Sequence, residues 1–194
     1  LDIFANIKNE NIPNTLTKQT IYSQEYDIVI KNGNVVIPGD GVIQANITIN
    51  NGKIISLTDD ETVNAKEIID AEGRYIAPGI IDPHVHLGLF APLEKELETE
   101  TVSALCGGIT TAGCFIGSEN SHFNSFPKIS ETINNKSHID IIPHLVISNQ
   151  IQMKEIRDYV EHLGVTSFKL YMNGIPGLIP DVDDGFMLDV FEEI

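Results

Sequence analysis

Downstream of residue 76, short apolar runs alternate with longer segments of helical period, and this alternation restricts the fold more than any other feature. Strands that alternate with helices of ten or more residues predict a parallel sheet whose neighbouring strands are connected through the helices. Such a sheet can close into a barrel or stay open as a doubly wound sheet. A Gly-x-Gly-x-x-Gly motif after a strand would favour the open sheet, but none of the strands is followed by one. The expected strands are Ala77–Gly88, Ile109–Ile116, Ile139–Ile147 and Val165–Met172, and the expected helices are Leu93–Leu105, Phe126–Asn135 and Ile151–Leu163.

The segment before these strands has a different pattern, in which turn residues interrupt short apolar runs. Asn32-Gly33 and Asn51-Gly52 each separate two such runs. Asn-Gly favours a two-residue hairpin turn because both residues tolerate positive φ. Residues 26–75 are therefore predicted to form a small antiparallel β unit. Residues 1–25 are rich in Asn, Thr, Lys and Gln without a clear period and are predicted to be a poorly structured extension.

The first strand of the alternating region ends in two closely spaced histidines, His84 and His86. Side chains two apart on a strand point to the same face, which also carries Asp82. Two neutral imidazoles on one face provide half of a metal site, and ligands at the end of a buried strand would open into a cleft. The structural alternative is that one histidine caps the strand while the hydrogen-bonding groups of the other are satisfied by neighbouring protein groups.

Three segments of the chain carry a match to a known family: Pro78–His86, Gly107–Thr111 and Ser167–Met172, in this order. With them the chain resembles the amidohydrolase superfamily, specifically the cyclic-amidase branch of dihydropyrimidinases, hydantoinases, allantoinases and dihydroorotases. The resemblance implies an α/β fold, the first half of a metal-dependent TIM (β/α)8 barrel preceded by a small β-sandwich segment. Residues 26–75 would belong to the sandwich, and residues 76–194 would form the first four β/α units. Because a whole barrel takes about 250 residues, we expect the chain to be the N-terminal portion of such a protein.

Lys169 lies inside an apolar strand, where an unpaired ammonium is costly to bury. The resemblance implies that carbon dioxide carboxylates this amine, giving a catalytic carbamate that bridges two divalent metal ions, with zinc expected. It also implies that His84 and His86 bind the more buried ion together with the carbamate. The family's other ligands, two histidines and an aspartate on later strands, are not in this sequence, so we expect no turnover by this chain alone. The alternative is a structural lysine paired with a carboxylate.

Contacts to substrate are predicted at three positions. Hydantoinases and dihydropyrimidinases carry an oxyanion-binding tyrosine several residues beyond the lysine, where this sequence has Asn173-Gly174. Tyr171 and Asn173 share the strand parity of Lys169 and are candidate substrate-binding residues, with a core position as the alternative for Tyr171. His122, in the loop expected after the second strand, is the third candidate because barrel active sites are built from such loops. A plain surface histidine is the alternative there.

The expected activity is hydrolysis of a carbon–nitrogen bond in a small cyclic amide or ureide, and the alternative is a non-catalytic relative that serves as a scaffold or binding protein. A formal charge of −16 argues against a phosphate-binding surface, so nucleic acid is not an expected partner. No stretch of the sequence approaches 18 uninterrupted apolar residues, so no membrane partner is expected either. Cys106 and Cys114 are not spaced as a Cys-x-x-Cys pair and resemble ordinary small buried residues, so a reducing, cytoplasmic setting is the default expectation. For the complete protein we expect a homo-oligomer, either a dimer or a tetramer.

Overall fold

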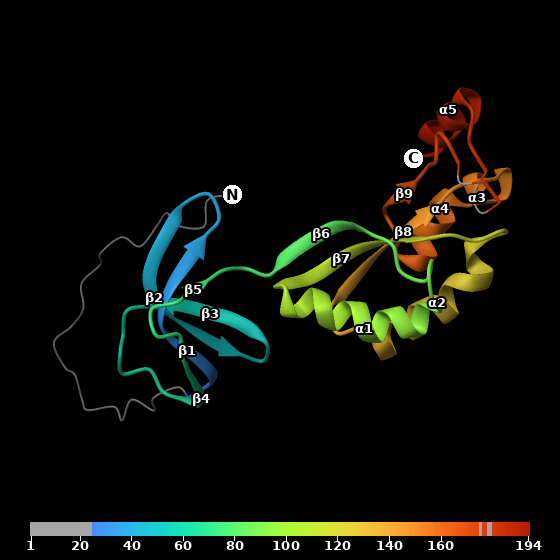
Figure 1. The fold of residues 1–194 in the computed structure, drawn as a ribbon. Coiled ribbons are helices and arrows are strands. Elements are labelled where there is room, and N and C mark those ends of the chain that lie inside the picture. Colours follow the sequence, from blue (N-terminus) through green and yellow to red (C-terminus); the bar gives the residue numbers. More distant parts are fainter. Residues whose placement is uncertain (1–24, 175, 178–179) are drawn as a thin grey trace. The chain divides into compact units, whose positions relative to one another are not determined.

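The computed structural model describes residues 25–174, 176–177 and 180–194. Apart from Glu25, the extension predicted for residues 1–25 lies outside the described residues. The chain divides into two compact units, one that ends at Pro78 and one that covers Gly79–Ile194 (Figure 1). The candidate site lies in the second unit.

The first unit is a five-stranded sheet with β1 at its centre. β2 pairs with β1 and with β3 in antiparallel orientation, whereas β4 and β5 both pair with β1 in parallel. The prediction of a purely antiparallel unit is therefore wrong, because the chain after β3 crosses to the other side of β1 and then runs in the same direction as β1. The strands are β1 (Tyr26–Ile37), β2 (Gly41–Asn50), β3 (Lys53–Thr58), β4 (Ala65–Asp70) and β5 (Tyr75–Ile76).

The two Asn-Gly pairs of this unit have different structures. Asn51 and Gly52 form the predicted turn between β2 and β3, with φ angles of 50° and 70°. Asn32-Gly33 is not a hairpin turn, since β1 continues through it and its pairing with β2 shifts register there. Asn32 has a φ of 56°, and its backbone N–H donates to Oδ1 of Asn46 at 3.1 Å. The positive φ that suits a hairpin turn is used here for a bulge inside a strand.

The second unit is built on a four-stranded parallel sheet whose strands follow chain order, β6-β7-β8-β9. Figure 1 shows α1 and α2 along the same side of this sheet, which curls as the first part of a barrel does. The predicted fold class, a partial barrel preceded by a sheet segment, is confirmed. The elements are β6 (Ile80–Val85), α1 (Leu93–Cys106), β7 (Ile109–Ile116), α2 (His122–Lys136), β8 (Asp140–Val146), α3 (Gln150–Lys154), α4 (Ile156–Asp158), the π-helix η1 (Tyr159–Leu163), β9 (Phe168–Lys169) and α5 (Asp184–Glu193).

The core of the second unit lies between the strands and the helices that follow them. Cys114 of β7 and Leu145 of β8 are buried in one cluster with Phe126 of α2, Ile156 of α4 and Tyr159 of η1. Successive side chains of a strand point to opposite faces, so the neighbours of these core residues, such as Phe115, face the other side of the sheet. The core thus holds the carboxyl-terminal halves of β7 and β8 in place while their other face stays available for a site.

Several predicted elements have different bounds in the structure, and two of these differences lie near the candidate site. α2 begins at His122 instead of near residue 126, because the hydroxyl of Ser121 caps the helix by accepting the backbone N–H of Phe123 at 3.2 Å. The fourth strand, predicted over residues 165–172, is reduced to Phe168 and Lys169, the residues that pair with β8. The loop after β7 is shorter than predicted because α2 begins earlier. Residues 170–174 follow the short β9 and are not part of the sheet.

The helix predicted over residues 151–163 is interrupted and ends as a π-helix. The wider π turn changes the helical phase, and within it Tyr159 is buried and Val160 is exposed. Gly164 ends the segment with a left-handed φ of 68°, as its position predicts. None of the helices in the described ranges has the length and apolar character to cross a membrane.

Candidate functional site

The two histidines of the His-x-His motif lie at the carboxyl end of β6. His84 is in the strand and His86 follows it, and both rings lie on the same side with their Nε2 atoms 3.3 Å apart. Asp82, which shares their parity, uses its Oδ1 atom to accept the backbone N–H of His84 at 3.0 Å. The carboxylate therefore orients the end of the strand, and the two rings present a convergent pair of nitrogen atoms.

The ring of Phe115, on β7, is the centre around which the other side chains gather. Its centroid lies 4.6 Å from that of His84, 5.2 Å from that of His86 and 5.2 Å from that of His144 on β8. The Nζ atom of Lys169 on β9 is 5.1 Å from the same centroid. Parallel register produces this gathering, since Phe115 and His144 are direct partners in the β7–β8 pairing.

Lys169 lies between two aromatic rings. Its Nζ atom is 5.1 Å from the ring centroid of Phe115 and 5.1 Å from that of Tyr171, both within the range of favourable cation–π contacts. Burial raises the pKa of Tyr171, so its hydroxyl stays protonated over the neutral range. The ammonium and the phenol are thus neighbours on one side of the sheet, in agreement with their shared parity in the sequence.

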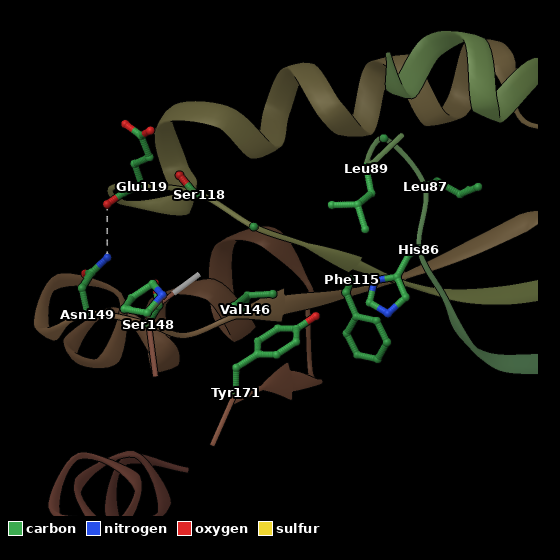
Figure 2. A pocket seen from close by; sticks show the side chains of 13 residues that line it. His86, Leu87, Leu89, Phe115, Ser118, Glu119, Val146, Ser148, Asn149 and Tyr171 are labelled. Atoms are coloured by element: carbon green, nitrogen blue, oxygen red, sulfur yellow. Dashed lines mark hydrogen bonds between the residues drawn. The ribbon is translucent and has the colours of Figure 1, made fainter. Parts of the chain in front are cut away.

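A pocket of about 560 Å³ opens beside these residues (Figure 2). Residues 87–89 after β6, residues 117–119 after β7 and residues 148–149 after β8 contribute to its lining, together with His86, Phe115 and Tyr171. Figure 2 shows the hydroxyl of Tyr171 directed toward the rings of Phe115 and His86. The pocket therefore lies at the carboxyl ends of the parallel strands, the place where barrel enzymes build their active sites.

The environment of His86 favours its neutral form. Loss of solvent lowers the pKa of this imidazole below the ordinary 6.5, and the charges of His84 and Lys169 lower the pKa further. A neutral imidazole has a free lone pair, which is what a metal ion requires. The surroundings of His86 in the pocket thus favour the form of the ring that can bind a metal ion.

Two of the predicted substrate-binding residues do not line the pocket. His122 is completely buried as the first residue of α2, so the loop position predicted for it is wrong. Its Nε2 atom donates to the carbonyl oxygen of Val146 at 2.8 Å, and burial lowers the pKa of its ring. Asn173 is exposed and is not among the residues that line the pocket. Tyr171 is the candidate of the three that reaches the pocket.

Phe115 and His144 are not among the site residues that the sequence predicts. In the structure His144 is half-buried, beside Phe115, and its Nδ1 atom is hydrogen-bonded to the hydroxyl of Ser167 at 2.5 Å. Gly113 makes room for this ring, since a Cβ atom there would collide with Nε2 of His144 and with the carbonyl oxygen of Pro83. A glycine inside a predicted central strand is the sequence signal for such a close approach.

The His84–His86 pair fits a shared metal ion. Two imidazole nitrogens, each about 2.0–2.1 Å from a tetrahedral zinc ion, are roughly 3.3 Å apart. The observed separation of the two Nε2 atoms is 3.3 Å. The amine of Lys169 lies 5.1 Å from the centroid of the Phe115 ring, which both histidine rings also contact. The assignment of His84, His86 and Lys169 as ligands stays a prediction.

Known proteins resemble this chain in sequence and in fold, although no protein-family model matches it. An allantoinase of Desulfitobacterium hafniense is 47% identical over 83 residues, which cover 43% of this chain and 18% of that protein. A D-hydantoinase of Ralstonia pickettii is 34% identical over 152 residues, or 75% of this chain and 33% of that protein. The solved L-hydantoinase (dihydropyrimidinase) from Arthrobacter aurescens is 28% identical with a TM-score of 0.76, covering 87% of this chain and 38% of that structure.

The chain therefore spans 18% of the allantoinase and 33% of the D-hydantoinase. The match with the L-hydantoinase includes the arrangement of the strands and not only short motifs, since it covers 87% of the chain at a TM-score of 0.76. Sequence and fold together show that the chain belongs to the cyclic-amidase branch of the amidohydrolase superfamily, where it corresponds to the N-terminal part.

Proposed function

We propose that the whole protein is a metal-dependent hydrolase that opens small cyclic amides or ureides at a carbon–nitrogen bond. One observation carries the proposal: two imidazole Nε2 atoms 3.3 Å apart and the amine of Lys169 meet around Phe115, beside a pocket at the carboxyl ends of parallel strands. The relatives named hydantoinase and allantoinase support the same class of reaction. This chain would supply the N-terminal part of the active site.

In this proposal, His84 and His86 hold one of two divalent metal ions through their neutral Nε2 atoms, and zinc is our candidate ion. Lys169, carboxylated by carbon dioxide, would supply two oxygens as further ligands for these ions. When bound, such ions lower the pKa of water and polarise a carbonyl group. The lowered pKa of His86 supports the assignment, because this ring binds a metal only when it is neutral.

The remaining residues of the pocket would hold the substrate. Tyr171 presents a protonated hydroxyl, which can donate a hydrogen bond to a carbonyl oxygen of a cyclic amide. Leu89, Phe115 and Val146 offer apolar surface to the faces of the ring. Asn173 does not line the pocket, so its contact with substrate stays a prediction. For His122 we propose an indirect role, through the carbonyl group of Val146.

Metal content and turnover of the whole protein test this function. After growth with added zinc, the wild type should contain divalent metal and should hydrolyse at least one of hydantoin, dihydrouracil, allantoin and dihydroorotate. His84→Ala should lose metal and turnover while keeping its fold, because the ring is exposed at a strand end. His138→Ala, at another exposed histidine, is the matched control and should behave as the wild type. Absence of bound metal and of turnover in the wild type would instead favour the non-catalytic relative.

Lys169→Ala tests the carbamate separately. We expect this variant of the whole protein to lose turnover and at least one metal ion, and we expect a short-chain carboxylic acid to restore part of both, because the site needs the two oxygens and uses the lysine as their carrier. Carboxylation should also add about 44 Da to the wild-type chain in native mass measurements. Full metal occupancy with an unmodified Lys169 would contradict the bridging role.

We also propose a cytoplasmic homo-oligomer that acts on small molecules. Cys106 and Cys114 are both free thiols, as is usual in a reducing compartment. The net charge of −16 supports a small-molecule substrate over nucleic acid. Sedimentation of the whole protein would give the oligomeric state directly.

A further inference from the structure

We propose that Gln152 is a positioning residue that fastens the loop after β7 to the loop after β8 and so sets the shape of the pocket. The proposal concerns the site of the proposed hydrolase and rests on that function for its kinetic consequence. Gln152 belongs to α3, behind the pocket, and does not line it. Its side chain would act on substrate only through the two loops.

The carboxamide of Gln152 is completely buried and makes four hydrogen bonds. Its Oε1 atom accepts the backbone N–H of Ser148 at 2.8 Å and lies 3.1 Å from the hydroxyl of the same residue. Its Nε2 atom donates to the carbonyl oxygens of Ser118 at 2.7 Å and Asn120 at 2.8 Å. One side chain therefore satisfies backbone groups of both loops.

The chemistry of the partners fixes the orientation of the carboxamide. A backbone N–H only donates and a carbonyl oxygen only accepts, so Oε1 must face Ser148 and Nε2 must face Ser118 and Asn120. Only a primary amide at this position can accept on one side and donate twice on the other. Glutamate would keep the acceptor and lose the donors, and methionine would fill a similar volume and lose both.

These contacts connect the loops in a region where the strands no longer do. The ladder between β7 and β8 ends at the pair Ile116–Leu145, before either loop begins. Beyond it, Ser118 and Ser148 both line the pocket. A second link supports the first, since Nδ2 of Asn149 donates to the carbonyl oxygen of Glu119 at 3.3 Å (Figure 2). The mutual position of the two pocket walls thus depends on α3.

Hydrogen–deuterium exchange of the whole protein tests this connection without reference to activity. In Gln152→Met, amides of both loops, residues 117–120 and Ser148, should exchange faster than in the wild type. In Gln152→Glu, the 117–120 loop should exchange faster while Ser148 stays protected, because the acceptor remains. Gln150→Glu and Gln150→Met, on the exposed first residue of the same helix, are the matched controls and should leave both loops unchanged.

The kinetic consequence is a change in substrate binding. Because the loops would contact substrate before and during the reaction, both Gln152 variants should raise KM by about tenfold or more while kcat stays within about threefold. Metal content should stay at the wild-type level, since the carboxamide contacts no proposed ligand.

Three results would overturn the proposal: wild-type exchange in both loops of a folded variant, faster exchange spread evenly over the molecule, or a lower kcat at unchanged KM. If Gln152→Met does not fold, Gln152→Glu decides the question: faster exchange in residues 117–120 with Ser148 still protected supports the proposal, and wild-type exchange in residues 117–120 overturns it. If the protein hydrolyses none of the cyclic amides, the proposed function fails, and the exchange pattern still decides whether Gln152 connects the loops.

Discussion

The ionisation of a single side chain makes the free energy of unfolding depend on pH. His86 has a lowered pKa because it loses solvent and faces the charges of His84 and Lys169. As the pH falls through 6.5, the unfolded chain therefore takes up a proton before His86 of the folded chain does. The contribution of this ring to the free energy of unfolding is fully present above pH 6.5 and decreases as the pH falls toward the folded pKa.

We expect His86 of the metal-free whole protein to titrate with a midpoint below 6.5 in an NMR experiment. In His84→Ala and in Lys169→Met the midpoint should move up toward 6.5, because each substitution removes one of the charges that oppose protonation. A midpoint at or above 6.5 in the wild type would mean that neither the loss of solvent nor the two charges lowers the pKa of His86.

At the level of elements, the close approach of β6, β7 and β8 depends on a missing side chain. Gly113 of β7 faces the carbonyl oxygen of Pro83 and the ring of His144, and a Cβ atom would collide with both. Gly113→Ala should therefore separate the strands and displace His84, which follows Pro83. We expect a loss of about 1–3 kcal/mol in the free energy of unfolding, together with reduced metal content.

Gly117→Ala is the control for this substitution. No atom lies within 4 Å of a Cβ placed there, so its unfolding curve should match the wild type. Equal curves for Gly113→Ala and Gly117→Ala in urea would show that the strands adapt without cost.

The junction of α2 with η1 depends on the hydroxyl of Tyr159. It accepts the backbone N–H of His122 at 3.0 Å and donates to Oε2 of Glu155 at 2.5 Å, and burial together with Glu155 raises its pKa to about 12. Tyr159→Phe leaves a buried N–H without an acceptor, which should cost about 1–3 kcal/mol of unfolding free energy. Tyr75→Phe, at a side chain that is 74% exposed, should cost nothing measurable by urea unfolding. Similar values for the two variants would rule out a role for the junction.

At the scale of the whole molecule, both units leave large apolar side chains exposed. In the second unit Ile80, Ile81 and Phe191 are 57%, 63% and 62% exposed. Apolar surface of this kind normally contacts another part of a protein or a partner. The 194-residue chain expressed by itself should therefore self-associate, which sedimentation at several concentrations would detect. A monodisperse monomer with cooperative unfolding would contradict this expectation.

The sequence by itself determined the features that depend on local chain geometry. The two periods of apolar residues predicted the alternating strands and helices, the parity of the His-x-His motif placed both imidazoles on one face, and Gly164 ended a helical segment. Each of these follows from interactions within a few residues of chain.

Only the tertiary structure decided which distant residues meet. A shift of one residue in the register of β7 would turn Phe115 away from His144 and Lys169, and no local property of the chain fixes that register. The same holds for Asn32-Gly33, which forms a bulge because β2 and β4 hold β1 on both sides. In the sequence, Gln152 is an ordinary polar residue. Its role depends on the packing of α3 against the two loops, whose backbone groups the Gln152 side chain hydrogen-bonds. Register and burial are set by the packing of the whole unit, so the sequence pattern alone cannot assign them.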